Sequence, residues 1–256
     1  MPSVATPALS DKQLAEMLTE MKRADSVELK LTIPESSQRS TVQALGIDPL
    51  GAQLRLVYFY DTPDLTLESQ GVVVRARRVA GKGDDSVVKL RPVVPAELPR
   101  SLRESPMCMV EVDAMPGGHV CSASLKGLPR TSVEDVAAGS APLRKLFSKE
   151  QRAFFAEHAP EGIGLEHLSL LGPIFVLKLK GTPQGYARKL VVELWLYPDG
   201  TRILELSTKC APSEAFQVAA ESRAFLAERD IDIGGAQTTK TRKALEFFSK
   251  QLAPTG

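Results

Sequence analysis

Four cationic side chains lie close together in residues 71–92, at a spacing that places them on strand faces. Two runs rich in β-branched residues, Val72–Val79 and Ser86–Arg91, flank the glycine- and aspartate-rich segment Gly81–Asp85. This pattern predicts a β-hairpin, in which alternate side chains share a face. The four cations are Arg75, Arg77, Lys89 and Arg91. A surface of this kind binds anions, although exposed lysine and arginine are also common on any outer wall.

Charged and apolar residues alternate on further predicted strands as well. The charged positions are Glu28, Lys30, Glu111, Asp113, Lys178, Lys180, Glu193 and Glu205. The opposite faces carry valine, leucine, isoleucine and alanine, which must be buried under helices or a second layer. Two geometries remain open: the charged faces meet solvent on an open sheet, or the sheet closes into a barrel with a polar interior.

A closed barrel with so many interior cations would require an anionic ligand, because unpaired buried charge is costly. Carboxylates beside those cations would repel a chain of phosphates. A divalent cation that bridges carboxylates and phosphates removes this conflict, as it does in phosphoryl-transfer sites. The charge pattern therefore points to a phosphate-containing ligand and a hard metal ion.

The elements that must position these residues are predicted from hydrophobic periodicity and turn signals. Strands are expected at Ser26–Ile33, Gln53–Tyr60, Val72–Val79, Ser86–Arg91, Met109–Ala114, Ile174–Lys180, Leu190–Tyr197 and Arg202–Lys209. Helices are expected at Asp11–Ala24, Gln38–Gly46, Pro142–His158, Ser213–Arg229 and Thr238–Lys250. Residues 116–141, rich in glycine, serine, proline and alanine, are expected to form loops around at most one short helix.

Composition excludes several classes of protein. The 256 residues are 43% hydrophobic and 25% charged, with a formal net charge of +1, so no global basic field draws the chain to nucleic acid or to a membrane. The basic strands also lack the interleaved aromatic residues that nucleic-acid grooves use. Three widely spaced cysteines argue against a disulfide framework or a zinc site. We expect a cytoplasmic protein with neither a signal peptide nor a membrane span.

Five segments together resemble the CYTH domain, the triphosphate tunnel superfamily that includes class IV adenylyl cyclases, thiamine triphosphatases and inorganic triphosphatases. They are YFYDTPDLTLESQGVVVRARR, VVKLRP, VELKLTI, VELWLYPDG and ILELSTK. The resemblance covers about residues 26–250. It implies an α+β fold, an eight-stranded antiparallel barrel with helices packed outside. Residues 1–25 would form an N-terminal segment with a short amphipathic helix, and 26–256 the tunnel domain.

The resemblance also implies roles for individual residues. Phosphate binding is expected from Lys30, Arg75, Arg77, Lys89, Arg91, Lys178, Lys180 and Lys240. Binding of Mg²⁺ or Mn²⁺ is expected from Glu28, Glu193 and Glu205, and catalysis from Glu28, Lys30 and Glu205. Two departures reduce the number of acidic metal ligands, because Ser26 and Ser207 stand where the family has carboxylates. Hard divalent cations depend on carboxylate count for affinity.

Three functions follow from this resemblance and its departures. The first is metal-assisted hydrolysis of inorganic triphosphate or of a small organic or nucleoside triphosphate. The second is cyclisation of ATP to cyclic AMP. The third is binding of a polyphosphate or nucleotide without turnover, which the retained cations and the two serines favour. The expected partner in every case is a small molecule that carries a triphosphate, or a polyphosphate. Binding of a triphosphate does not by itself distinguish these three functions.

Overall fold

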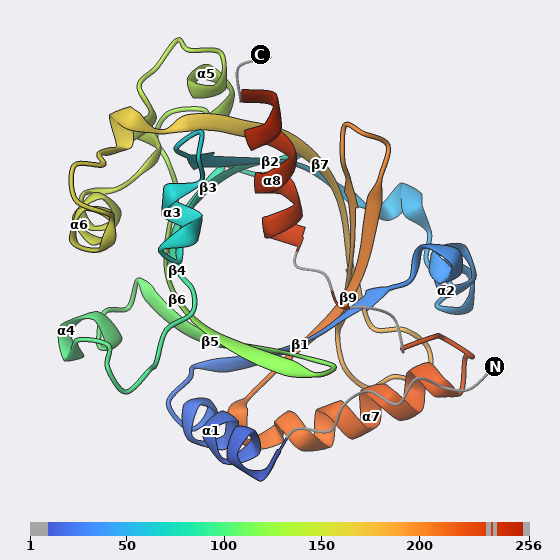
Figure 1. Cartoon of the computed structure of the whole chain (residues 1–256). Coiled ribbons are helices and arrows are strands. Elements are labelled where there is room, and N and C mark those ends of the chain that lie inside the picture. Colours follow the sequence, from blue (N-terminus) through green and yellow to red (C-terminus); the bar gives the residue numbers. More distant parts are fainter. Residues whose placement is uncertain (1–9, 234–236, 238–239, 253–256) are drawn as a thin grey trace.

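Nine strands form a closed barrel in the computed structural model, which describes residues 10–233, 237 and 240–252 (Figure 1). The strands are β1 (Ser26–Ile33), β2 (Gln53–Asp61), β3 (Val72–Val79), β4 (Asp85–Leu90), β5 (Cys108–Met115), β6 (Gly118–Gly127), β7 (Ser169–Gly181), β8 (Leu190–Leu196) and β9 (Arg202–Cys210). Around the barrel they follow the order β1-β5-β6-β4-β3-β2-β7-β8-β9, and β9 closes on β1.

The barrel differs from the prediction in strand number and direction. It has nine strands rather than eight, and β1 pairs with β5 in parallel while the neighbouring pairs are antiparallel. The additional strand is β6, which lies in the segment 116–141 that was predicted to be loops. Around a closed ring with an odd number of strands, direction cannot alternate at every step. One parallel pair is therefore required, and the seam between β1 and β5 supplies it.

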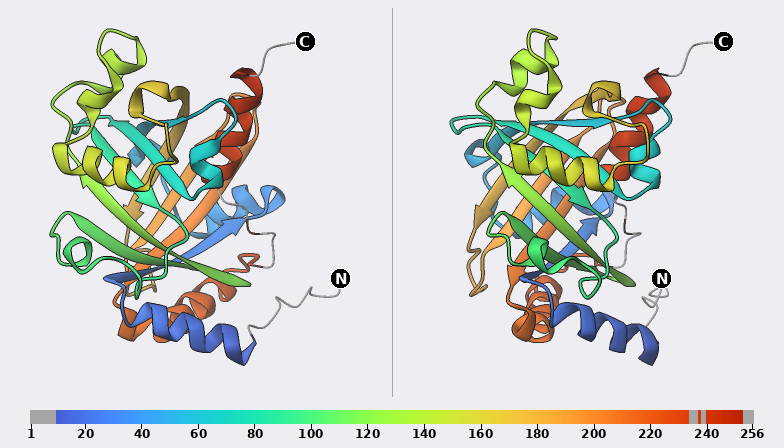
Figure 2. Two further views of the ribbon diagram at one scale, coloured as in Figure 1. Left: turned by 60° about the vertical axis from the view of Figure 1, so that its left-hand side comes forward. Right: turned by 90° about the vertical axis from the view of Figure 1, so that its left-hand side faces the viewer.

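Helices cover the outside of the barrel and one of its ends (Figures 1 and 2). They are α1 (Asp11–Met21), α2 (Gln38–Ala44), α3 (Thr66–Ser69), α4 (Arg100–Arg103), α5 (Val133–Ala137), α6 (Lys149–His158), α7 (Ala215–Ala227) and α8 (Lys240–Leu252). The described residues also form five short 3₁₀ helices: η1 (Glu35–Ser37), η2 (Pro49–Gly51), η3 (Leu143–Leu146), η4 (Leu165–His167) and η5 (Pro212–Glu214). None of the described helices is both long and apolar enough to cross a membrane.

Most predicted helices are present with shifted ends. The helix expected at Pro142–His158 is divided into η3 and α6, because Ser148 begins a new helix with a capping box to Gln151. The helix expected at Ser213–Arg229 is likewise divided into η5 and α7. The C-terminal helix begins at Lys240, and Thr238, its predicted first residue, lies outside the described residues.

The alternation along each strand separates an apolar outer face from a charged inner face. On β3, Val74 and Ala76 are buried in a cluster that includes Phe154 and Phe155 of α6. On β9, Leu206 packs in the same way beside residues of α7. The intervening positions point into the barrel, where they line a cavity. The hydrophobic core therefore lies between barrel wall and helices, and the interior is left for charged groups.

Helix α8 closes one end of the barrel with apolar residues. Ala244, Leu245 and Phe248 are buried in a cluster with Phe59 of β2 and Trp195 of β8. Figure 1 shows α8 lying across the ring of strands. The first residue of α8 is thereby held at the edge of the charged interior.

Gln151 of α6 joins two strands to a helix through a fully buried amide. Its Nε2 donates to the carbonyl oxygens of Ser86 on β4, at 3.2 Å, and Leu125 on β6, at 3.1 Å. Its Oε1 accepts from the backbone N–H of Ser148 at 2.9 Å, which caps α6. Buried polar groups of this kind are costly to leave unpaired.

We predict that Gln151→Ala lowers the free energy of unfolding by about 2 to 4 kcal/mol, because several buried hydrogen-bond partners lose the amide. Urea denaturation followed by circular dichroism measures this change. The matched control is Gln217→Ala on α7, an exposed glutamine whose side-chain amide donates to Glu221 on the same helix. Its effect should stay within about 0.5 kcal/mol. Equal effects of the two substitutions would contradict the bridging role.

Candidate functional site

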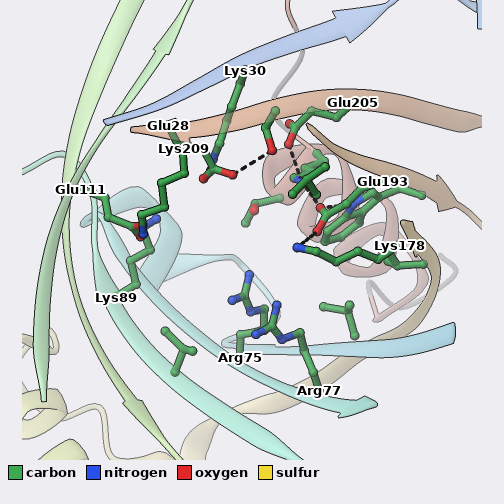
Figure 3. Close-up of a pocket in the computed structure, with 18 of the residues that line it drawn as sticks. Glu28, Lys30, Arg75, Arg77, Lys89, Glu111, Lys178, Glu193, Glu205 and Lys209 are labelled. Carbon is green, nitrogen blue, oxygen red and sulfur yellow. Dashed lines mark hydrogen bonds and ion pairs between the residues drawn. The ribbon is translucent and has the colours of Figure 1, made fainter. Parts of the chain in front are cut away.

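A cavity of about 450 Å³ occupies the interior of the barrel (Figure 3). Within the described residues, eight lysines, four arginines and four glutamates line it. The cations are Lys30, Arg55, Arg75, Arg77, Lys89, Arg91, Lys126, Lys178, Lys180, Lys189, Lys209 and Lys240. The glutamates are Glu28, Glu111, Glu193 and Glu205. All eleven residues predicted for phosphate, metal or catalytic roles therefore lie in this one cavity, although their roles stay predictions.

The basic wall consists of Arg75 and Arg77 on β3 with Lys89 on β4 and Arg91 directly after it. Arg77 is held by a bidentate ion pair, its Nε 2.8 Å and its Nη2 2.7 Å from the two carboxylate oxygens of Asp85. The Nη1 of Arg91 lies 3.2 Å from Oδ2 of Asp113. These pairs fix two cations of the wall in place.

The other two cations of the basic wall, Arg75 and Lys89, have no acidic partner among the described residues. Within the part of the chain that the structure describes, no carboxylate lies within 4.0 Å of the charged groups of Arg75 or Lys89, and Nε of Arg75 is buried without a hydrogen-bond partner. Burial, together with the charge of Arg77, lowers the pKa of Arg75 to about 10. Burial lowers the pKa of Lys89 to about 8, against the attraction of Asp113. Both groups would gain from a bound anion.

The acidic residues lie mainly across the cavity from the arginines. In Figure 3, Glu28, Glu193 and Glu205 approach the cavity from one side, and Arg75 and Arg77 from the opposite side. Register explains the placement, because Glu193 of β8 pairs directly with Glu205 of β9. The cavity thus has a basic wall and an acidic wall.

Lys30 lies between the carboxylates at the β1–β5 seam. Its Nζ is 2.9 Å from Oδ1 of Asp113 and 3.3 Å from Oε2 of Glu28. Burial would lower the pKa of Lys30, but Asp113, Glu28 and Glu205 outweigh it and raise the pKa. The other oxygen of Glu28 accepts a hydrogen bond of 2.9 Å from the hydroxyl of Ser207. Lys30 is therefore charged, and Glu28 contacts one lysine and one serine.

Glu193 and Glu205 are neutralised by lysines. Lys178 on β7 donates to Oε1 of Glu193 at 2.8 Å. Lys240, the first residue of α8, forms ion pairs with Oε2 of Glu193 and, at 2.6 Å, with Oε1 of Glu205. Burial would raise the pKa of Glu193, but the charges of Lys240 and Lys178 hold it well below its usual range.

Comparison of the sequence with protein-family models and with curated proteins finds no match. The fold, in contrast, is similar to solved structures. A candidate adenylyl cyclase from Hippeastrum with a dominant triphosphatase activity is 16% identical, with a TM-score of 0.64 over 86% of this chain and 95% of that one. A candidate adenylate cyclase from Bacillus halodurans is 13% identical, with a TM-score of 0.59 over 86% and 97%.

The barrel therefore shares its fold with these two solved structures. Identities this low establish the architecture alone. They do not assign an activity to this barrel.

The three predicted metal ligands, Glu28, Glu193 and Glu205, do not fit a divalent cation as they lie. Glu193 and Glu205 share the ammonium group of Lys240, and Glu28 contacts Ser207 and Lys30. Among the described residues, no three histidine, cysteine, aspartate or glutamate side chains are arranged to hold a metal. The oxygens that Mg²⁺ or Mn²⁺ requires are thus taken by ammonium groups and a hydroxyl.

Several residues of the cavity were missed or given no role by the sequence analysis. They are Arg55, Glu111, Lys126, Lys189 and Lys209. Arg55 shares a face with Val57 on a strand that was predicted, and both residues line the cavity, so strand parity could have identified Arg55. Lys126 lies on β6, where the small residues of the segment gave no strand signal. Lys209 contacts Glu111 across strands that are distant in sequence, which no local pattern reveals.

We predict that Glu193→Gln lowers the free energy of unfolding by about 3 kcal/mol, because Lys178 and Lys240 lose their shared counter-charge inside the barrel. The matched control is Glu246→Gln, which removes a solvent-exposed partner of Arg242 on α8. Exposed pairs contribute little, so its effect should stay below about 1 kcal/mol. Urea denaturation measures both. A loss no larger than the control's would show that the cavity is wet enough to screen these charges.

Proposed function

We propose that the barrel binds the triphosphate group of a small molecule, inorganic triphosphate or an organic or nucleoside triphosphate, and hydrolyses it. The observation that carries this proposal is the basic wall, in which Arg75 and Lys89 face the cavity without an acidic partner among the described residues. Buried cations without counter-charge are costly, and a multivalent anion supplies that charge. Planar guanidinium groups suit phosphate oxygens in particular.

Charge balance supports a highly charged ligand rather than a simple carboxylate. Among the described residues, twelve cations and four glutamates line the cavity, so this lining carries a large excess of positive charge. Several cations that line a narrow cavity can bind one phosphate chain at the same time. A single carboxylate has too few charged oxygens to contact all of them. Inorganic triphosphate and the triphosphate end of a nucleotide both meet this requirement.

Hydrolysis is the reaction we propose first, because the structural neighbour from Hippeastrum has a dominant triphosphatase activity. Phosphoryl transfer depends mainly on positioning and on stabilisation of charge on the equatorial oxygens. The basic wall, with Lys30, provides that stabilisation. Glu28 is the acidic-wall carboxylate that faces the cavity with the weakest lysine contact, at 3.3 Å. We assign it the role of accepting the proton from the attacking water.

The first test measures binding by thermal denaturation. Inorganic triphosphate in EDTA, at a hundredfold excess over its Kd, should stabilise the fold by about 2.7 kcal/mol. For a chain of this size that raises Tm by about 5 to 10 °C. Arg75→Ala should remove most of the shift. The matched control is Arg78→Ala, because Arg78 lies on the same strand but is exposed and pairs with Glu134. An unchanged Tm for the wild-type protein would refute the proposed ligand.

Product analysis then separates the reactions. Orthophosphate released from a panel of triphosphates, with and without Mg²⁺ or Mn²⁺, and abolished in Arg75→Ala, supports hydrolysis. Cyclic AMP with an equal amount of pyrophosphate from ATP would instead identify a cyclase. A Tm shift without any product would identify a binding module, and would refute the hydrolytic half of the proposal.

Lys89 makes the proposed binding depend on pH. Its pKa of about 8 in the free protein rises when an anion binds, because the anion stabilises the charged form. The contribution of Lys89 to affinity is therefore complete below pH 8 and is lost as the pH rises above it. We predict that the ratio of triphosphate affinities, wild type over Lys89→Met, falls by about tenfold between pH 7.5 and 9.5.

Isothermal titration calorimetry measures both affinities at each pH. The ratio cancels the titration of triphosphate itself, which is common to the two proteins. A ratio that stays constant over this range would show that Lys89 does not contact the ligand as a titrating cation.

A further inference from the structure

Two carboxylates of the acidic wall are held face to face by the register of the barrel. Glu193 and Glu205 are directly paired residues on β8 and β9, with side-chain exposures of 12% and 8%. Like charges directly opposite each other on neighbouring strands repel. We call this pair the acidic subsite. It requires a cation between its members, whichever ligand the rest of the cavity binds.

Lys240 supplies that cation from a different part of the chain. Its Nζ contacts Oε2 of Glu193 and lies 2.6 Å from Oε1 of Glu205. It also lies 5.0 Å from the centre of the Trp195 ring, a cation–π distance. The ammonium group thus has three partners inside the cavity, and its side chain is only 16% exposed.

The position of Lys240 is fixed by its helix rather than by the ion pairs alone. The hydroxyl of Tyr197 donates to the carbonyl oxygen of Lys240 at 2.9 Å. Farther along α8, Ala244, Leu245 and Phe248 are buried in the cluster that closes the barrel end. Removal of Lys240 from the acidic subsite would therefore require either a rotamer change in a confined space or movement of the helix start.

Within the described part of the chain, few further carboxylates are available as metal ligands near the acidic subsite. Ser207 lies next to Glu205 on the inner face of β9, and its hydroxyl donates to Glu28 at 2.9 Å instead of providing a charged ligand. Ser26, at the start of β1, is buried. A divalent cation at the acidic subsite would have to displace an ammonium group and would find few further charged oxygens. Metal affinity falls with the number of carboxylate ligands.

We propose that the ammonium group of Lys240 is the built-in cation of the acidic subsite, so that the cavity binds triphosphate without a divalent cation. Lys240 excludes Mg²⁺ and Mn²⁺ from Glu193 and Glu205. The acidic wall is neutralised from within the chain, and it does not repel the phosphates that the basic wall holds. The triphosphate half of this inference rests on the proposed function, and the exclusion of metal does not.

The exclusion of metal is tested with Mn²⁺ alone, on the full-length protein without triphosphate, by calorimetry and by the electron paramagnetic resonance signal of free Mn²⁺. Lys240→Met removes the cation that Glu193 and Glu205 share, leaving only Lys178 on Glu193, and should bind Mn²⁺ at least tenfold more tightly than wild type. Lys240→Arg retains the cation and should resemble wild type. Mn²⁺ binding of equal strength in wild type and Lys240→Met would overturn the proposal.

The matched control is Lys209→Met. Lys209 also lines the cavity and also pairs with a glutamate, Glu111, so its loss changes the net charge of the cavity by the same amount. Its Mn²⁺ affinity should stay within about twofold to threefold of wild type. The loss of one positive charge acts on Mn²⁺ alike in both variants, and Lys240→Met alone also removes the cation of the acidic subsite. An equal gain in Lys209→Met and Lys240→Met would assign the effect to net charge and overturn the specific role of Lys240.

Wild-type protein gives a second measurement that does not depend on whether Lys240→Met folds. Triphosphate should bind in EDTA, and Mg²⁺ should not increase its affinity. A gain of tenfold or more with Mg²⁺ would overturn metal-free binding. If triphosphate does not bind under any condition, the proposed function fails, and the Mn²⁺ comparison still decides the role of Lys240 at the acidic subsite.

Discussion

Every charged group inside the barrel needs an opposite charge, and the rest of the structure depends on this requirement. Strand alternation places lysine, arginine and glutamate in the interior because the other faces are required to bury the core against helices. Water and ion pairs must then replace the solvation that these groups lose. Lys30, Lys178, Lys209 and Lys240 each satisfy this requirement through a carboxylate. The ion pairs therefore result from the way the barrel places charged side chains inside, and they also fix where those side chains lie in the cavity.

The same requirement divides the cavity into regions with different chemistry. Around Glu193 and Glu205 the charges are satisfied within the protein, and the local field is nearly neutral. Around Arg75 and Lys89 the described residues leave positive charge uncompensated. In the proposed complex the phosphates therefore contact the basic wall, where Arg75 and Lys89 have no acidic partner among the described residues. The same asymmetry would orient a long anion, with the acidic wall on its other side.

The sequence was sufficient to predict the strands that carry strong alternation and the residues on their charged faces. It predicted the β3–β4 hairpin closely and placed Arg75, Lys89 and Glu205 on such faces, while the barrel that turns these faces inward was implied by the resemblance alone. It failed at β6, where glycine, serine and alanine replace the β-branched residues that mark strands. It could not predict that Lys240 meets Glu193 and Glu205, because such contacts between distant residues depend on how the completed barrel seats α8.

The closure of the barrel links its first strand to its last. Val27 of β1 and Cys210 of β9 are paired residues that lie 183 positions apart, and the parallel seam with β5 joins β1 to the middle of the chain. Pairings of such high contact order form slowly, and here the opposing walls face each other only once every seam has closed. The cavity with both walls in place therefore exists only in the closed ring. A ligand that contacts both walls would bind only molecules in which that ring is complete.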